Sequence, residues 1–209
     1  MAALLCLALS TLSADARADT AQPACAPSAP PTAAYLEKIH ELGQMLGITN
    51  DYGSKHGMMI EPQAARVVVA GKDIYGYDLT LAPAAADAYR RMIAAAAQDG
   101  VSIQGVSGFR SAQDQYDIMA SDLRKGASLA HVLARNTPPG YSQHQTGRAI
   151  DLATPGSEPV TRAFASTIAY RWLAKHAASF GFSMTYPAGN SQGIEFEPWH
   201  WYYDTVECH

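Results

Sequence analysis

The chain has 209 residues, of which 48% are hydrophobic and 16% charged, and its formal net charge is -4. This length and apolar content suffice for a domain with a buried core and exclude a wholly disordered chain, a collagen-like repeat and a long coiled coil. The negative charge argues against a nucleic-acid binder that depends on a basic surface. No uninterrupted apolar run reaches the length of about 18 residues that a membrane span requires, so no span is expected in the mature protein.

The first 18 residues have the pattern of a secretory signal peptide. An apolar stretch covers residues 2–12, and Ala16-Arg17-Ala18 fits the small-x-small cleavage motif. No basic residue precedes the apolar stretch, so a buried N-terminal helix is the alternative interpretation. We expect an exported protein, periplasmic or associated with the cell wall, that begins at Asp19 after cleavage.

The segment that follows predicts a linker and holds one of two cysteines of the expected mature chain. Residues 19–32 are rich in alanine and proline, which is typical of an extended, poorly packed segment. Cleavage would remove Cys6 and leave Cys25 and Cys208. In an exported protein this pair is a candidate disulfide. Two free thiols are the alternative, and neither cysteine has the spacing of a zinc ligand pair.

Helices and strands are predicted in mixed order beyond the linker. Apolar spacing predicts helices over residues 35–46, 83–98, 111–123, 128–134 and 161–179. Strand-like runs cover residues 66–70, 74–79, 101–107, 148–152, 182–186, 194–196 and 199–203, the first two joined as a hairpin. Since there is no regular βαβ alternation, we predict an α+β fold with a mainly antiparallel sheet flanked by helices. Residues 33–80 would form an N-terminal helix and hairpin, a candidate cap, and residues 81–209 the main domain.

The segment from Ser142 to Asp151 brings a histidine and a carboxylate close in sequence. Gly147 permits a sharp turn, which can bring His144 back toward Asp151 on the strand that follows. An imidazole nitrogen and a carboxylate oxygen are ligands that zinc accepts. Taken alone, a histidine–aspartate hydrogen bond on a loop explains the pair equally well.

A second segment, Glu195 to Tyr203, offers another candidate ligand in His200 and a carboxylate in Glu197. A regular strand would point these two side chains to opposite faces. A shared site therefore requires a bend near Pro198. The alternative is an aromatic edge strand with a solvated histidine and glutamate.

A third segment places Arg110 where a predicted strand ends and a helix begins. A glycine-containing corner can project this arginine into a cleft, whereas a surface arginine is the alternative. Ser111 can cap the helix, and Gln115 follows one turn later. Together, His144, Asp151 and His200 would give zinc three protein ligands and leave a position for water. Glu197 would then act as general base and Arg110 as oxyanion partner in amide hydrolysis.

Three stretches, SGFRS, PGYSQHQTGRAID and EPWHWYY, resemble the VanY-type D-alanyl-D-alanine carboxypeptidases. These are zinc peptidases of the bacterial cell wall, with a fold shared by the signalling domain of Hedgehog proteins. The resemblance runs from about residue 81 to 204. It implies this fold for residues 81–209, as a zinc peptidase domain.

The resemblance also implies roles for individual residues. It places the family's zinc ligands on His144, Asp151 and His200, with one Zn2+ per chain, and its catalytic glutamate and arginine on Glu197 and Arg110. Two further positions, Ser142 and Gln115, match residues that contact the substrate peptide. Many members have an arginine where this chain reads Trp201-Tyr202-Tyr203, which affects substrate details and not the metal set.

The implied activity is removal of the terminal D-Ala from peptidoglycan stem peptides by a metal-activated water. Three related cuts on the same wall use the same machinery: L,D-carboxypeptidase, D,D-dipeptidase and endopeptidase. A zinc-bearing binding domain without turnover is the alternative of another class, and the presence of Glu197 and Arg110 argues against it. Neither the cleaved bond nor the oligomeric state follows from the sequence.

Overall fold

The computed structural model describes residues 30–204. The predicted signal peptide, nearly all of the predicted linker, and Cys25 and Cys208 lie outside these residues, so the disulfide stays a prediction. The helices are α1 (Ala33–Met45), α2 (Tyr52–His56), α3 (Pro83–Gln98), α4 (Ala112–Arg124), α5 (Leu129–Arg135) and α6 (Ile168–His176), with 3-10 helices η1 (Gln143–Thr146), η2 (Arg162–Ser166) and η3 (Ala177–Phe180). The strands are β1 (Val68–Lys72), β2 (Asp78–Leu81), β3 (Gln104–Ser107), β4 (Ala149–Ala153), β5 (Phe182–Met184) and β6 (His200–Tyr203).

The strands form two antiparallel sheets, which confirms the predicted α+β class. The larger sheet has the order β3-β4-β6-β5, and β1 and β2 form a separate hairpin. Asp151 of β4 is paired directly with His200 of β6 and also with Ser107 of β3. The centre of this sheet therefore brings two of the predicted zinc ligands side by side.

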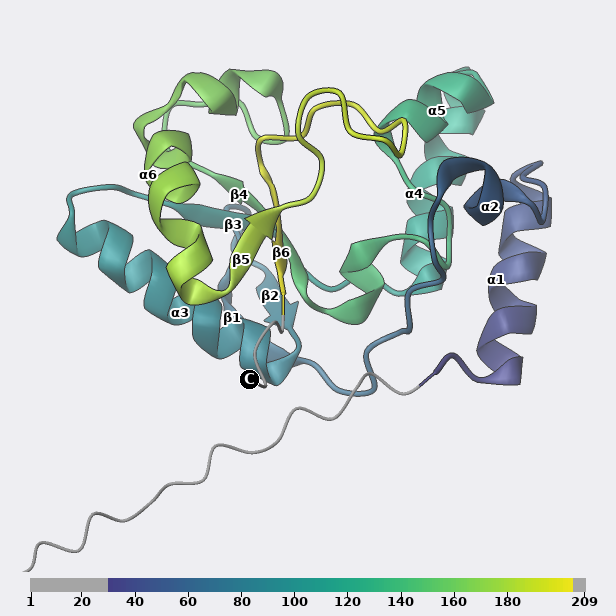
Figure 1. The fold of residues 1–209 in the computed structure, drawn as a ribbon, viewed down its shortest axis with the longest axis horizontal. Coiled ribbons are helices and arrows are strands. Elements are labelled where there is room, and N and C mark those ends of the chain that lie inside the picture. The colour runs from purple at the N-terminus through teal and green to yellow at the C-terminus, as the bar shows by residue number, and fades with distance from the viewer. Residues whose placement is uncertain (1–29, 205–209) are drawn as a thin grey trace, which may run out of the picture.

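Helices lie on both sides of the larger sheet, as Figure 1 shows, with α3 and α6 on one side and α1, α4 and α5 on the other. The alternation along β4 explains the division, because successive side chains of a strand point to opposite faces. Ile150 and Leu152 enter the main apolar core with Met92 and Leu173, from α3 and α6. Asp151, between them, points to the opposite face, on the side of α4 and α5, where it contacts His144 and His200.

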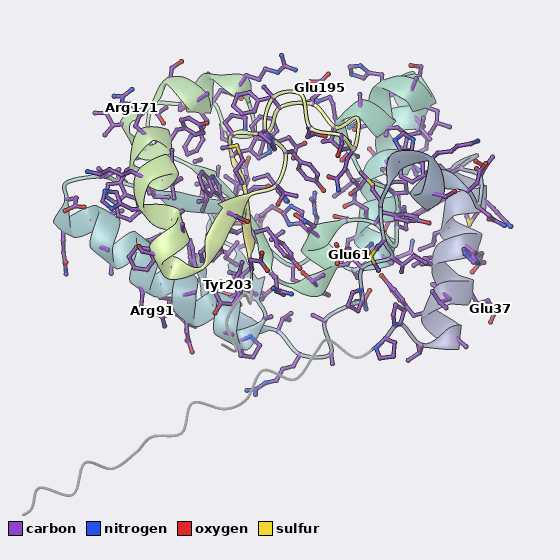
Figure 2. The ribbon with its side chains drawn as sticks, viewed as in Figure 1. Glu37, Glu61, Arg91, Arg171, Glu195 and Tyr203 are labelled. Carbon is purple, nitrogen blue, oxygen red and sulfur yellow. The ribbon has the colours of Figure 1, made fainter. Side chains whose placement is uncertain are left out.

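Charged side chains cover the outer faces of three helices. Glu37, Arg91 and Arg171 are exposed on the outer faces of α1, α3 and α6 (Figure 2). Within residues 30–204 we find no helix that combines the length and the apolar character needed to cross a membrane.

The hairpin forms as predicted, but its turn lies later in the chain. The strands pair from Val68 with Leu81 to Lys72 with Asp78. The side chain of Asp73 accepts hydrogen bonds from the backbone N–H groups of Tyr75 and Tyr77 at 2.8 and 2.9 Å. This carboxylate therefore organises the turn, which the predicted strands over residues 66–70 and 74–79 placed at residues 71–73.

The predicted helix over residues 161–179 is wrong as a single element. It is divided into η2, α6 and η3, because Thr167 has an extended backbone and caps α6. Its hydroxyl oxygen accepts from the N–H of Tyr170 at 3.1 Å and donates to the carbonyl of Phe164 at 2.7 Å. A threonine hydroxyl that bonds the backbone in this way competes with helix continuation.

Residues 194–196 do not form the predicted strand. They lie in a loop whose Glu195 N–H donates to the carbonyl of Ala134, at the end of α5, at 2.9 Å. The Asn190 side chain also donates to the carbonyl of Ile194 at 2.7 Å. The backbone groups that a sheet would use are thus satisfied by a helix end and by an amide side chain.

Candidate active site

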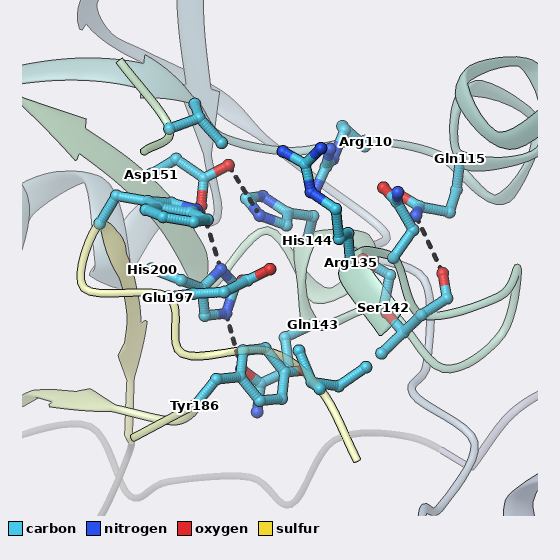
Figure 3. Close-up of a pocket in the computed structure, with 15 residues that line it drawn as sticks. Arg110, Gln115, Arg135, Ser142, Gln143, His144, Asp151, Tyr186, Glu197 and His200 are labelled. Carbon is cyan, nitrogen blue, oxygen red and sulfur yellow. Dashed lines mark hydrogen bonds and ion pairs between the residues drawn. The ribbon is translucent and has the colours of Figure 1, made fainter. Parts of the chain in front are cut away.

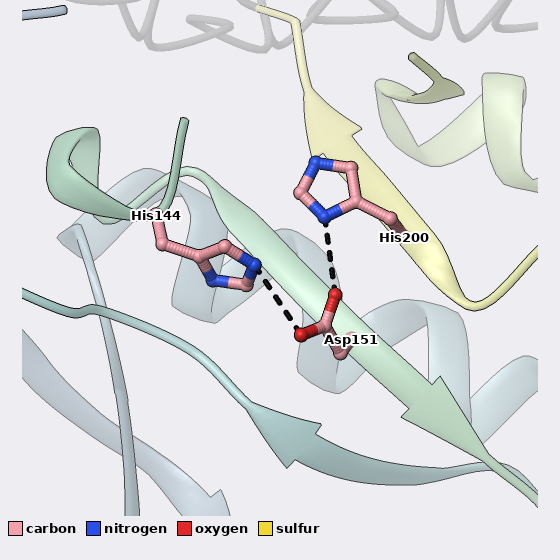
Figure 4. A group of neighbouring side chains, drawn as sticks. All are labelled: His144, Asp151 and His200. Carbon is pink, nitrogen blue, oxygen red and sulfur yellow. Dashed lines mark hydrogen bonds and ion pairs between the residues drawn. The ribbon is translucent and has the colours of Figure 1, made fainter. Parts of the chain in front are cut away.

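The predicted ligands converge between the sheet and the loop that precedes β4. His144, Asp151 and His200 are all buried, and their ligand atoms all lie within 4.8 Å of one another (Figure 4). His144 belongs to η1, and Gly147 ends this turn with a φ of 66°. A Cβ at Gly147 would lie 2.9 Å from the backbone nitrogen of Ala82. The glycine thus lets the loop turn sharply and pack closely, as the sequence predicted.

The hydrogen bonds of His144 determine which ring nitrogen faces Asp151. Its Nδ1 lies 2.6 Å from the carbonyl oxygen of Gly108, which can only accept. Nδ1 therefore carries the proton, and Nε2 presents a lone pair in the neutral ring. Burial, together with the charge of Arg110, lowers the pKa of His144 to about 4, so the ring is neutral at pH 7.

His200 is arranged in a similar way on the other side of Asp151. Its Nε2 lies 3.0 Å from Oε1 of Gln143, and its Nδ1 lies 3.1 Å from Oδ1 of Asp151. If Nε2–H donates to Gln143, Nδ1 presents its lone pair to the carboxylate. An outer hydrogen bond of this kind orients metal-ligating histidines.

This arrangement fits a cation. Nε2 of His144 is buried, lacks a hydrogen-bond partner and lies 3.3 Å from Oδ2 of Asp151. Two hydrogen-bond acceptors whose lone pairs face each other at this distance repel unless a positive charge lies between them. Two imidazole nitrogens and a carboxylate oxygen are a donor set suited to zinc. The three residues could therefore hold a metal ion.

Glu197 and Arg110 line the same cavity as these three residues (Figure 3). Glu197 is buried, and the N–H of His200 donates to its carbonyl at 3.1 Å, which closes a tight turn over Pro198. This is the predicted bend, and it brings both side chains to one cavity. Burial raises the pKa of Glu197 to about 7, against the attraction of His200 and Arg110. A carboxyl group with this pKa is suited to exchange protons at neutral pH.

Arg110 is positioned by the histidine loop, since its N–H donates to the carbonyl of His144 at 3.2 Å. Its Nε is buried without a hydrogen-bond partner in the structure. Burial lowers the pKa of Arg110, and the carboxylates of Asp151 and Glu197 raise it. A guanidinium in this position can bind an oxyanion or a carboxylate in the cavity.

The two predicted substrate contacts also line this cavity. Ser142 is buried at the start of η1. Gln115 is buried on α4, where its Nε2 donates to the carbonyl of Thr137 at 2.9 Å and its Oε1 has no partner. The adjacent Ser111 caps α4, as predicted, through a capping box with Asp114.

Several lining residues were missed from the sequence. Tyr186 packs its ring against that of His200 with 4.9 Å between the centroids, and Gln143 accepts from the same ring. Gln143 lies inside the quoted motif, so its position beside His144 was the available signal. Arg135 and Val160 come from other segments and become neighbours only through the fold.

Comparison with known proteins identifies a family for most of this region. Residues 78–206 match the family model of VanY, D-alanyl-D-alanine carboxypeptidase. A D-alanyl-D-alanine carboxypeptidase of Enterococcus faecalis (strain ATCC 700802 / V583) is 33% identical over 124 residues, which are 54% of this chain and 44% of the relative. YodJ of Bacillus subtilis (strain 168) is 36% identical over 121 residues, 56% of this chain and 43% of YodJ. The chain thus spans less than half the length of these two relatives.

Solved structures share the fold. The LdcB LD-carboxypeptidase superposes with a TM-score of 0.61 at 29% identity, covering 68% of this chain and 69% of LdcB. A mutant of the VanY D,D-pentapeptidase from a VanB-type resistance cassette, in complex with Zn(II), gives a TM-score of 0.54 at 26% identity, covering 70% of this chain and 85% of VanY. Because the family match covers more than half of its residues, this chain belongs to the VanY D-alanyl-D-alanine carboxypeptidase family.

Proposed function

We propose that this chain is an exported zinc-dependent D,D-carboxypeptidase that removes the terminal D-Ala of peptidoglycan stem peptides. The observation that carries the proposal is the buried cluster of His144, Asp151 and His200, whose ligand atoms all lie within 4.8 Å of one another, in a cavity that also holds Glu197 and Arg110. Family membership supports the same reaction class. The zinc complex of the related VanY supports the choice of metal.

Three side chains would hold the metal: His144 through Nε2, His200 through Nδ1, and Asp151 through its carboxylate. Zinc in such a site supplies a Lewis acid for the scissile carbonyl and lowers the pKa of a water ligand toward neutrality. Gly108 and Gln143 keep the two rings oriented through the outer hydrogen bonds. The chain thereby provides a preformed donor set.

The remaining steps are carried out by groups of the chain. Glu197 takes the proton of the attacking water and returns it to the departing amine, so that one carboxyl group serves as base and then as acid. Arg110 stabilises the negative charge that develops on the carbonyl oxygen. Burial of both side chains excludes bulk water, which strengthens these charge interactions.

The L,D-carboxypeptidases are the second candidate class. The LdcB structure aligns with a higher TM-score than the VanY zinc complex, 0.61 against 0.54. The metal and acid–base groups are the same for both cuts, so residues farther along the cleft determine the choice. Pentapeptide and tetrapeptide substrates distinguish the two activities.

The test uses purified residues 19–209 and a stem pentapeptide that ends in D-Ala-D-Ala. Mass spectrometry would follow the products with and without a chelator, and again after zinc is restored. Loss of one alanine that is abolished by chelation and rescued by zinc is expected. Cleavage of only the tetrapeptide would replace the D,D assignment with L,D. No cleavage by zinc-loaded protein would favour a binding domain.

Export is part of the proposal and rests on the pattern of residues 1–18. N-terminal sequencing of the mature protein from producing cells should begin at Asp19 in the envelope or secreted fraction. An intact N-terminus in the cytoplasmic fraction would contradict export and leave the chemistry of the site untouched.

A further inference from the structure

A second cavity adjoins the one that contains the His144, Asp151 and His200 cluster and shares part of its wall. It has a volume of 410 Å3, against 70 Å3 for the first, and is lined by α4, α5 and the loop before β6. Six residues line both cavities: Arg110, Arg135, Asn136, Val160, Glu197 and Trp199. A carboxypeptidase releases a single terminal residue, so the rest of the peptide must extend away from the scissile bond. The larger cavity provides the room for it.

Along this second cavity Arg135 is available in addition to Arg110, which is assigned to the reaction centre, and the positive charge of Arg135 lowers the pKa of Glu197. Asp122 lies 3.5 Å from Lys125, and Glu195 lies 3.2 Å from Arg162, so these two acids already have basic partners. Glu197 is the proposed base. Arg135, the last residue of α5, forms no ion pair or side-chain hydrogen bond within residues 30–204. Figure 3 shows its side chain projecting into the cavity near Arg110.

The wall that the two cavities share contains, besides Arg135, a residue with a strained backbone. Val160 has a φ of 54° and is the one non-glycine residue with a positive φ between residues 30 and 204. This backbone conformation is unfavourable for a β-branched side chain, and such strain is concentrated at ligand-binding sites. Val160 also packs against the main core, so the wall at the junction of the two cavities is held in place.

We propose that Arg135 is a specificity-determining residue that binds a carboxylate on the part of the substrate preceding the scissile bond. The inference rests on the proposed carboxypeptidase function and deepens it by naming an acidic peptide as the preferred substrate. A guanidinium binds a carboxylate through two parallel hydrogen bonds. Such a contact forms with substrate and transition state alike, so its loss raises KM and leaves kcat nearly unchanged.

The test compares the wild type with Arg135→Gln on two pairs of synthetic stem pentapeptides. One pair differs at residue two, with the free carboxylate of D-glutamate or its carboxamide. The other differs at residue three, with diaminopimelate or lysine. We expect the substitution to raise KM about tenfold for the member of one pair that carries the carboxylate and less than twofold for the partner that lacks it. The pair that responds identifies the source of the carboxylate.

Arg124→Gln is the matched control, because Arg124 also lies in the last turn of a helix, is exposed and lines neither cavity. An equal loss on all four peptides would overturn the subsite and indicate an effect on Glu197 or on the terminal carboxylate. Unchanged kinetics would overturn it as well. If the zinc-loaded wild type cleaves none of the peptides, the proposed function fails, and the subsite is tested by binding alone. In that case, calorimetry measures the binding of the four peptides to zinc-loaded Glu197→Gln. Tighter binding of the peptides with the additional carboxylate would support the subsite, and equal binding of all four would overturn it.

Discussion

Glu197→Gln should separate the catalytic use of this carboxyl group from its contribution to stability. The substitution keeps the size of the side chain and removes its ability to ionise. We expect activity to fall by about 10^2- to 10^4-fold, the range that general acid–base catalysis contributes. Zinc content should stay at the wild-type level, because Glu197 is not among the three clustered ligands.

The effect on stability follows from the pKa of Glu197, which burial raises from 4.5 to about 7. In the folded, metal-free protein this group keeps its proton to higher pH than in the unfolded chain. Stability is therefore lost as pH rises from 4.5 to 7, and the full penalty is present above pH 7. The difference of the two pKa values corresponds to about 3 kcal/mol.

Glutamine carries no such penalty, so metal-free Glu197→Gln should be more stable than the wild type. The expected gain is about 1 kcal/mol at pH 5 and about 3 kcal/mol at pH 8. Urea unfolding with a chelator at the two pH values measures it. Bound zinc favours the carboxylate and should reduce the gain.

Glu195→Gln is the control, since Glu195 is two residues away and pairs with Arg162 on the surface. An exposed ion pair contributes at most about 1 kcal/mol, so this variant should lack the large gain at pH 8. A gain for Glu197→Gln that does not increase with pH would refute the argument that burial of a charge sets the stability difference. A nearly unaffected rate would refute the assignment of Glu197 as the base.

Three further substitutions test the positioning of the site. His144→Ala should lose bound zinc in a metal assay, whereas His131→Ala, outside the cluster, should retain it. Gly147→Ala should lower the free energy of unfolding in urea by about 1–3 kcal/mol. Gly126→Ala is the control and should cost less, because Gly126 also has a positive φ but a Cβ there meets no atom, whereas a Cβ at Gly147 meets a backbone atom. Tyr35→Phe should cost about 1 kcal/mol in the same assay, since the Tyr35 hydroxyl bonds the carbonyl of Glu61 and Oε1 of Gln145 at 3.0 and 3.1 Å; an unchanged unfolding curve would contradict this.

The convergence of the three predicted ligands depends on one local turn and one pairing of distant strands. His144 and Asp151 are seven residues apart in sequence, and one glycine with a positive φ turns the chain between them. His200 requires only that β6 pair with β4. The turn follows from a local rule, whereas the strand pairing joins residues 49 positions apart, and the sequence supplied it only through the family resemblance of the two motifs.

The breaks and the cleft walls were less predictable because they depend on competition between local and distant contacts. Residues 161–179 have helical spacing throughout, and the break arises from a Thr167 hydroxyl that bonds the backbone. Glu195 bonds the end of α5 rather than a strand. Arg135 and Val160 line the same cavities only because α5 and the segment after β4 pack together in the fold.

The same difference explains why the reaction class is easier to infer than the substrate. The candidate metal ligands and Glu197 lie on β4, β6 and two adjoining turns, whose hydrogen bonds leave little freedom. The second cavity is built from helix ends and loops, where substitutions change charge and shape without disturbing the sheet. Arg135 lies on such an end, so it can alter substrate preference while the ligands stay in place. Substrate selectivity within this family should therefore follow the residues at this end of α5 more closely than the residues of the metal site.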